Sequence, residues 1–276
     1  MSGNTPELAA DLPAGFTTTC MELQRVATHI LSRGRAADAG RIGLRATPTG
    51  ITTPMFGAHS TVLRMAGTVL VKEHERGQGP VVDVMELTGR SLADAAEFAG
   101  VDLGAPFEPG SDAPPVGDRT AVLDLDAGVV DLVWSWFGIG AAALDVVLPV
   151  LVGPTVAQVW PEHFDIGLVA ATGSGGVNLG ACPGDAYVSE PYFYVAPWAS
   201  VRPGDPEFWN APFGAVVTRS ALADSNNPVA AGGRFFVSGL TVLGPASPCW
   251  ARPDRAGSGL TTAGLRCAAT SGAPAG

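Results

Sequence analysis

The chain has 276 residues, a formal net charge of −10 and 46% hydrophobic residues. These totals suit one large globular domain or two small ones and exclude an intrinsically disordered chain. The 16 lysines and arginines are scattered along the sequence. Without a basic patch on an acidic chain, neither nucleic acid nor an anionic membrane surface is an expected partner.

The cysteines give no sign of a metal or disulfide framework. Cys20, Cys182, Cys249 and Cys267 lack CxxC spacing, so the sequence predicts no metal site, and the pattern is typical of thiols in a reducing compartment. The N-terminal region carries prolines and acids instead of an apolar run of signal-peptide length. We therefore expect a cytoplasmic protein without a cofactor.

In chain order, residues 1–16 read as a flexible lead-in. Thr19 and Glu22 have the spacing of a capping box and predict a helix that begins there and ends at Gly34,. About four strands follow between residues 42 and 87. A second, short helix is predicted from Ser91 to Gly100,.

Residues 104–118 are rich in proline, glycine and acids and predict a linker between halves 17–103 and 119–244,. After it, a narrow stripe of polar and small residues interrupts an otherwise apolar run. This pattern predicts a buried central helix over about residues 126–150. Asp131 and Asp145 argue against a membrane span in the same segment,.

The second half again reads as a helix, about four strands and a helix that ends near residue 244. Both halves contain an Ile-Gly-Leu triplet, at residues 42–44 and 166–168. The sequence thus predicts a single α+β domain over residues 17–244, with largely antiparallel sheets packed on the buried central helix. It also predicts an internal pseudo-repeat of helix, four strands and helix. Residues 245–276 lack periodicity and read as a disordered tail,.

Several phrases of the sequence resemble, as a set, an uncharacterised bacterial family, the domain of unknown function 5996. The phrases are Arg41-Ile-Gly-Leu-Arg, Thr47-Pro-Thr-Gly-Ile-Thr-Thr-Pro, Trp160-Pro-Glu-His-Phe-Asp, Pro183-Gly-Asp, Glu190-Pro-Tyr-Phe-Tyr-Val and Phe208-Trp209. The resemblance covers roughly residues 17–244. It implies a soluble α+β fold and brings no activity or catalytic residue.

The best chemical cluster is Glu162, His163 and Asp165. In an extended segment, His163 and Asp165 would share one face, and a carboxylate beside an imidazole suits a general base. This pattern supports a hydrolase or isomerase that uses His163 with Asp165 or Glu162. A hydrogen-bonded structural histidine near a strand start is the more frequent explanation, and no HxH or HExxH spacing supplies further metal ligands.

A second candidate site is aromatic. Its members are Trp160, Tyr192, Tyr194, Trp198 and Trp209. They could line a cleft for a small apolar or cationic molecule. That they fill the interface between sheet and helix is the more frequent explanation, and a face that binds another protein is a further one. We carry forward a small-molecule-binding protein as the leading hypothesis, with the enzyme and the protein-interaction module as alternatives. The sequence leaves the oligomeric state open.

Overall fold

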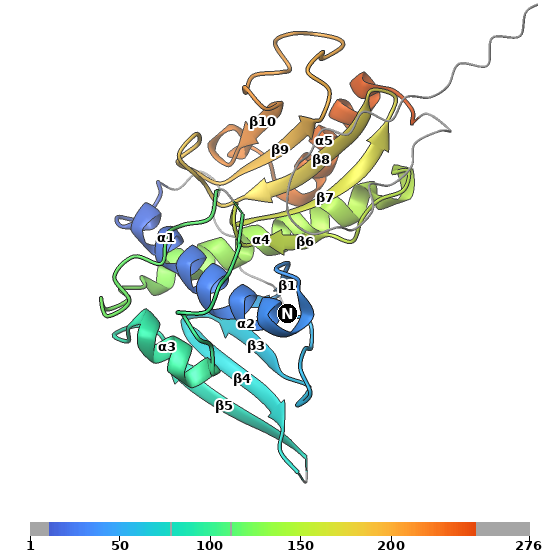
Figure 1. The fold of residues 1–276 in the computed structure, drawn as a ribbon. Helices are drawn as coiled ribbons and strands as arrows, with labels where there is room; N and C mark the ends of the chain where they lie inside the picture. Colours follow the sequence, from blue (N-terminus) through green and yellow to red (C-terminus); the bar gives the residue numbers. More distant parts are fainter. Residues whose placement is uncertain (1–10, 78, 111, 247–276) are drawn as a thin grey trace, which may run out of the picture.

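The computed structural model describes residues 11–77, 79–110 and 112–246. The predicted tail therefore lies almost entirely outside the described residues, as does most of the lead-in. Within them, the predicted α+β class is confirmed: helices pack on two antiparallel sheets of five strands each (Figure 1).

Each sheet is a meander in which every strand pairs with its neighbour in sequence. The first sheet contains β1 (Arg45–Thr47), β2 (Gly50–Thr52), β3 (Val62–Ala66), β4 (Val69–Glu75) and β5 (Pro80–Glu86). The second contains β6 (Gln158–Trp160), β7 (Asp165–Thr172), β8 (Gly175–Cys182), β9 (Tyr192–Pro197) and β10 (Ala215–Thr218). Each half thus has five strands where the sequence predicted about four.

The two sheets meet edge to edge. Leu44, just before β1, and Val159 of β6 exchange backbone hydrogen bonds of 2.9 and 3.0 Å. Both side chains are fully buried. This one bridge places the sheets side by side, so that β5 and β10 are the two outermost strands (Figure 1).

The first helical rod begins earlier than its sequence suggests. Its parts are α1 (Phe16–Val26), a π-helical stretch η1 (Ala27–Ser32) and α2 (Arg33–Ala39). The capping-box prediction is wrong: Gly15 precedes the helix, and the Thr19 hydroxyl instead accepts the N–H of Asp126 at 3.3 Å. Phe16, one turn before Thr19, is buried in the first turn of the helix. Apolar packing of Phe16 therefore extends the helix toward the N-terminus, past the predicted start at Thr19. The rod also runs past Gly34 and ends at Gly40 in a left-handed conformation,.

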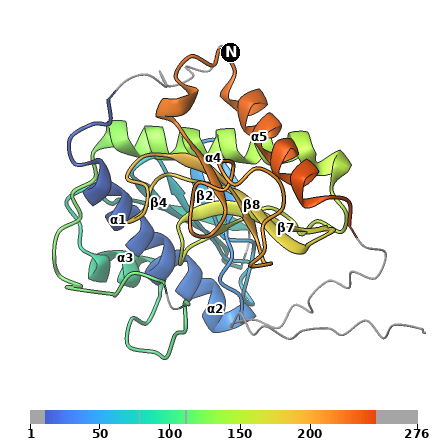
Figure 2. The ribbon, with the colours of Figure 1, turned by 90° about the horizontal axis from the view of Figure 1, so that it is seen from above.

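The predicted central helix is confirmed as α4 (Ala127–Val147), followed by a 3₁₀ turn, η2 (Leu148–Val150). Asp126 caps it by accepting the N–H of Val129 at 2.9 Å,. It packs against β1 and β2 of one sheet and β7 and β8 of the other. Figure 2 shows α5 (Pro228–Leu243) lying beside it. The fully buried Trp136 and Phe137 each contribute about 2–3 kcal/mol of hydrophobic stabilisation,.

By length and composition alone, the segment Ala127–Val150 could cross a membrane. Half of its most apolar window is buried inside the protein. Since α4 packs on both sheets and on α5, this half of the apolar surface is used inside the protein, and the arrangement is compatible with a soluble protein,.

The remaining helices complete the order in each half. They are α3 (Leu92–Ala99) and the 3₁₀ turn η3 (Ser220–Leu222). Helix α3 begins after Ser91 and ends at Gly100, as predicted, and Ser91 and Asp94 form a capping box at its start. Each half therefore runs helix, five strands, helix. The two Ile-Gly-Leu triplets are not equivalent in it, because residues 42–44 precede β1 whereas residues 166–168 lie in the second strand of their sheet. The pseudo-repeat as a superposition stays a prediction.

Candidate functional site

The turn between β6 and β7 presents the predicted catalytic residues. Phe164 has a positive φ of 52°, and its N–H closes the turn on the carbonyl of Trp160 at 2.8 Å. Its ring is buried against Trp134 and Phe137 of α4. The segment is therefore not extended, and the expectation that His163 and Asp165 share one strand face is wrong.

His163 lies at the surface of this turn. Its imidazole is half exposed, and Nδ1 is 3.5 Å from Oδ2 of Asp112. Asp112 belongs to the 104–118 connection, which the sequence described as a linker. The structure thus brings a carboxylate from the connection to the histidine, where the sequence paired that histidine with Asp165.

Glu162 lies beneath the same connection. A Cβ added at Gly110, which has a φ of 114°, would be 3.2 Å from Cγ of Glu162, so the backbone of the connection approaches this side chain closely. The Oε2 atom is buried and has no hydrogen-bond partner among the described residues. Burial raises the pKa of the Glu162 carboxyl to about 7, with His163 opposing this shift and Asp165 and Asp112 adding to it,.

Asp165 begins β7 and is buried. Its Oδ2 accepts the hydroxyl hydrogen bond of Tyr194 from β9, while Oδ1 has no partner among the described residues. Burial raises the pKa of Asp165 to about 6, and the bond from Tyr194 works in the opposite direction. Glu162 and Asp165 are therefore two carboxyl groups that can hold protons near neutral pH.

Glycines decide how Tyr194 reaches Asp165. Gly167, Gly180 and Tyr194 are paired across β7, β8 and β9. A Cβ would lie 2.7 Å from the Tyr194 hydroxyl oxygen at Gly167 and 2.4 Å at Gly180. The tyrosine therefore lies across two positions without side chains, and any larger residue would displace it.

The other predicted aromatic residues are dispersed along the sheet. Tyr192 is buried and donates to Oδ2 of Asp185 at 2.6 Å. Trp160 is half-buried in β6. Trp198 lies against Gly176 and donates to Asn178 at 2.8 Å, and Trp209 donates to the carbonyl of Pro203 at 2.8 Å. These rings pack on the sheet and on loops, and Trp198 is exposed.

The first helical rod holds the turn and the connection together. Gln24 and Thr28 donate to the carbonyl of Pro161, at 3.3 and 3.1 Å. Gln24 also donates to the carbonyl of Glu162 at 2.9 Å. These bonds hold the backbone of the turn that carries Glu162 and His163.

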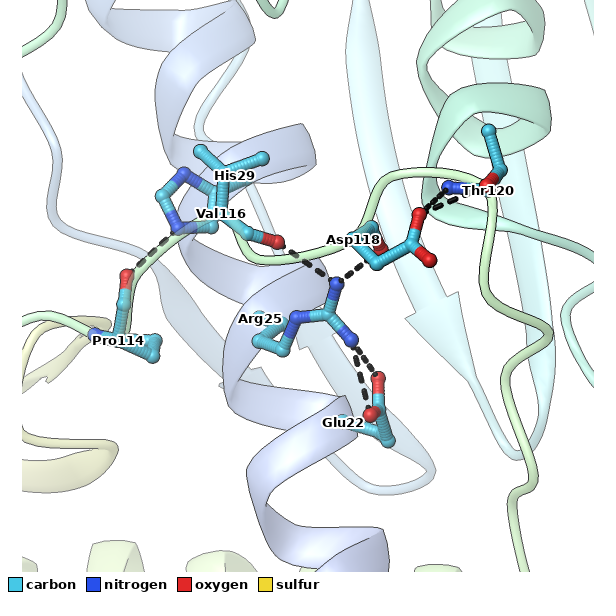
Figure 3. A network of polar contacts seen from close by, with 7 residues as sticks. All are labelled: Glu22, Arg25, His29, Pro114, Val116, Asp118 and Thr120. Carbon is cyan, nitrogen blue, oxygen red and sulfur yellow. Dashed lines mark hydrogen bonds and ion pairs between the residues drawn. The ribbon is translucent and has the colours of Figure 1, made fainter.

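A neighbouring stripe of the rod binds the 104–118 connection. Arg25 donates to the carbonyls of Val116 and Asp118 at 2.7 and 3.0 Å (Figure 3). His29, in the π-helical stretch, bonds the carbonyl of Pro114 at 2.8 Å. Arg33 donates to the carbonyls of Asp102 and Ala105. Sequence reasoning missed this stripe, although its four-residue spacing was visible,.

Two hollows of the described surface lie elsewhere. One of about 550 Å³ opens between α4 and α5 and is lined by Val146, Val229, Gly233 and Val237, among others. Another of about 360 Å³ lies at the start of α1 beside Ser189. Neither contains a residue of the predicted aromatic cleft.

No family model, no curated protein and no solved structure matches the chain. The resemblance to the uncharacterised bacterial family stays a prediction. The functional argument therefore depends on the geometry of the site.

Proposed function

We propose that this chain binds a small neutral or cationic molecule beside His163 and transfers a proton to or from it through Glu162. The observation that carries the proposal is the buried, unpartnered Oε2 of Glu162, in the residue before His163, whose half-exposed imidazole acts on this carboxyl electrostatically. A carboxyl group whose pKa is near 7 can act as either acid or base at neutral pH,.

The surrounding charges support the class of ligand. Asp112 and Asp165 both act on Glu162 electrostatically, and the whole chain carries a net charge of −10. An anionic substrate would be repelled by this environment, whereas a neutral or cationic one would not. His163 is the group that a ligand from solvent would meet first, because half of it is exposed.

The arrangement favours an isomerase over a hydrolase. Two carboxyl groups of raised pKa and one imidazole suit abstraction and return of a proton. The aromatic cleft is a weaker candidate, because Tyr192 and Tyr194 are committed to bonds with Asp185 and Asp165. We propose the cytoplasm as its location; the two described cysteines, Cys20 and Cys182, are buried and unpaired, which suits a reducing compartment,.

Hydrogen–deuterium exchange tests the proposal directly. Small carbonyl compounds are incubated with the protein in D₂O, and NMR follows loss of their acidic C–H signals. A thermal-shift screen of the same compounds reports binding. We expect at least one compound to bind and exchange, Glu162→Gln to abolish exchange while binding persists, and His163→Ala to weaken binding.

His59→Ala, a change at an exposed histidine of the first half, is the matched control and should leave both signals unchanged. The proposal is wrong if exchange is equal in the wild type and Glu162→Gln, or if neither binding nor exchange occurs across the set.

A further inference from the structure

Three of the four sheet edges are covered. The β1 and β6 edges face each other through the bridge of Leu44 and Val159. At the β10 edge, the side chain of Asn210 accepts the N–H of Val216 at 2.8 Å and donates to its carbonyl at 3.0 Å. Asn210 thus occupies the positions that another strand would take.

The fourth edge, β5, has no such cover among the described residues. The backbone of Leu87 bonds Thr68, and Arg76 bonds Gly79. Because antiparallel pairs alternate, the odd-numbered residues of β5 bond β4, and residues 82, 84 and 86 direct their N–H and C=O groups outward,. Figure 1 shows β5 at the free end of the first sheet.

The side chains at this edge are apolar and exposed. Val82 is 58% exposed and Val84 is 66% exposed. Both lie on the sheet face opposite to Leu70, since Val84 pairs with Val71,. An incoming strand would therefore find a row of free hydrogen-bonding groups flanked by two valines, which is the geometry of strand addition.

We propose that β5 pairs with β5 of a second copy of this chain, antiparallel, about a two-fold axis through Val84. In this register Val84 faces Val84 of the second copy, Val82 faces Glu86, and Asp83 faces Met85. The outward groups of residues 82, 84 and 86 are symmetric about Val84, so both copies supply the same donors and acceptors.

Charge and proline select this register. A shift by two residues would overlap the whole strand but would place Asp83 opposite Asp83 and Pro80, which lacks an N–H, opposite Glu86. Like charges directly opposite each other destabilise a sheet. The register centred on Val82 overlaps as many residues and also opposes no two carboxylates, but it places Pro80, which lacks an N–H, at one of the outward positions that must pair,. The register centred on Val84 avoids both the facing carboxylates and the proline. The two acidic copies repel each other overall, so added salt should tighten the dimer,.

Disulfide trapping tests the register. In a background with Cys249→Ser and Cys267→Ser, Val84→Cys places two thiols on facing residues whose Cα atoms are about 5.5 Å apart, within the range of about 4.4–6.8 Å that a disulfide accepts. Val82→Cys is the matched variant, because its two thiols would be about 13 Å apart. We expect about tenfold more cross-linked dimer from Val84→Cys than from Val82→Cys under mild oxidation. Equal or reversed yields would overturn the register.

Sedimentation of the full chain over a range of concentrations tests the dimer itself. Val84→Pro removes the outward N–H at the axis without touching a bond to β4, and Val84→Lys sets two cations against each other. Both should be monomeric, while Val150→Lys, at a valine that is 65% exposed elsewhere, should dimerise like the wild type. A wild type that stays monomeric at every concentration and salt, or a dimer that survives both Val84 variants, overturns the proposal.

Discussion

Tyr194 of β9 reaches Asp165 of β7 across two glycines, Gly180 on the intervening strand β8 and Gly167 on β7. The tyrosine hydroxyl is the one described partner of a buried carboxyl group whose other oxygen is unpaired. This relationship ties the start of β7 to β9 and keeps Asp165 close to the turn that carries Glu162 and His163.

Tyr194→Phe should raise the pKa of Asp165 above its value of about 6, because the tyrosine bond lowers it in the native protein. The loss of stability should be about 1–2 kcal/mol at pH 8, where Asp165 is ionised, and smaller at pH 5. Urea unfolding at both pH values measures it. Tyr192→Phe, which removes the hydroxyl bonded to Asp185, is the comparison. An equal loss at both pH values for Tyr194→Phe would contradict the explanation.

Gly180→Ala should destabilise the protein by about 2–4 kcal/mol, since the new Cβ would meet both the Tyr194 hydroxyl and the carbonyl of Ile166 at about 2.5 Å,. Gly138→Ala is the control, because Gly138 is an exposed helical glycine with nothing near its Cβ position. It should stabilise the protein by about 0.5–1 kcal/mol. Thermal unfolding of both variants measures these changes. A Gly180→Ala protein of native stability would show that the Tyr194 side chain does not need position 180 to be without a side chain.

Glu162 should make stability depend on pH. Its folded pKa of about 7 exceeds the ordinary value of 4.5, so the folded state binds the proton more tightly than the unfolded state. The contribution is therefore complete below about pH 4.5 and is lost as pH rises through 7. Glu162→Gln removes this proton-linked contribution. As pH rises from 5 to 8, the free energy of unfolding of Glu162→Gln should therefore increase by on the order of 2 kcal/mol relative to that of the wild type.

Chemical denaturation of both proteins across this range measures the gain, and Glu75→Gln, at an exposed glutamate of β4, serves as the reference substitution. A difference between wild type and Glu162→Gln that stays constant with pH would contradict the raised pKa.

Arg25→Ala should release the 104–118 connection. The change removes two bonds to backbone carbonyls and the ion pair with Glu22 at 2.6 Å, at a cost of about 2 kcal/mol. Hydrogen exchange should quicken at the described residues of the connection. Arg64→Ala breaks a half-exposed ion pair with Glu73 and should cost under about 1 kcal/mol. Unchanged exchange in Arg25→Ala would show that other contacts hold the connection.

The sequence predicted those elements whose own residues determine them. Helix α4 has a narrow polar stripe along its 21 residues, and α3 begins after Ser91 as predicted. Thr19 and Glu22 also have the spacing of a capping box, but no helix begins there, because the helix starts upstream where Phe16 is buried. Strands β1 and β6 have three residues each, too few for alternation to reveal them.

The candidate site also combines residues that the local sequence reveals with contacts that only the fold creates. Glu162, His163 and Asp165 were found because they are adjacent in sequence. Their contacts were missed because strand register and chain folding supply them: Asp112 comes from the connection, and Tyr194 comes from β9, two strands away from Asp165. The glycines at 167 and 180 acquire a role only when the register aligns them with Tyr194.

The most direct test is a site-resolved titration of the Glu162 carboxyl, by ¹³C NMR of selectively labelled protein with Glu162→Gln for assignment. The account predicts a midpoint near pH 7, because burial beneath Gly110 disfavours the charged form. A midpoint below about pH 5, the range of an ordinary solvated glutamate, would contradict it and remove the proton donor on which the proposed function depends.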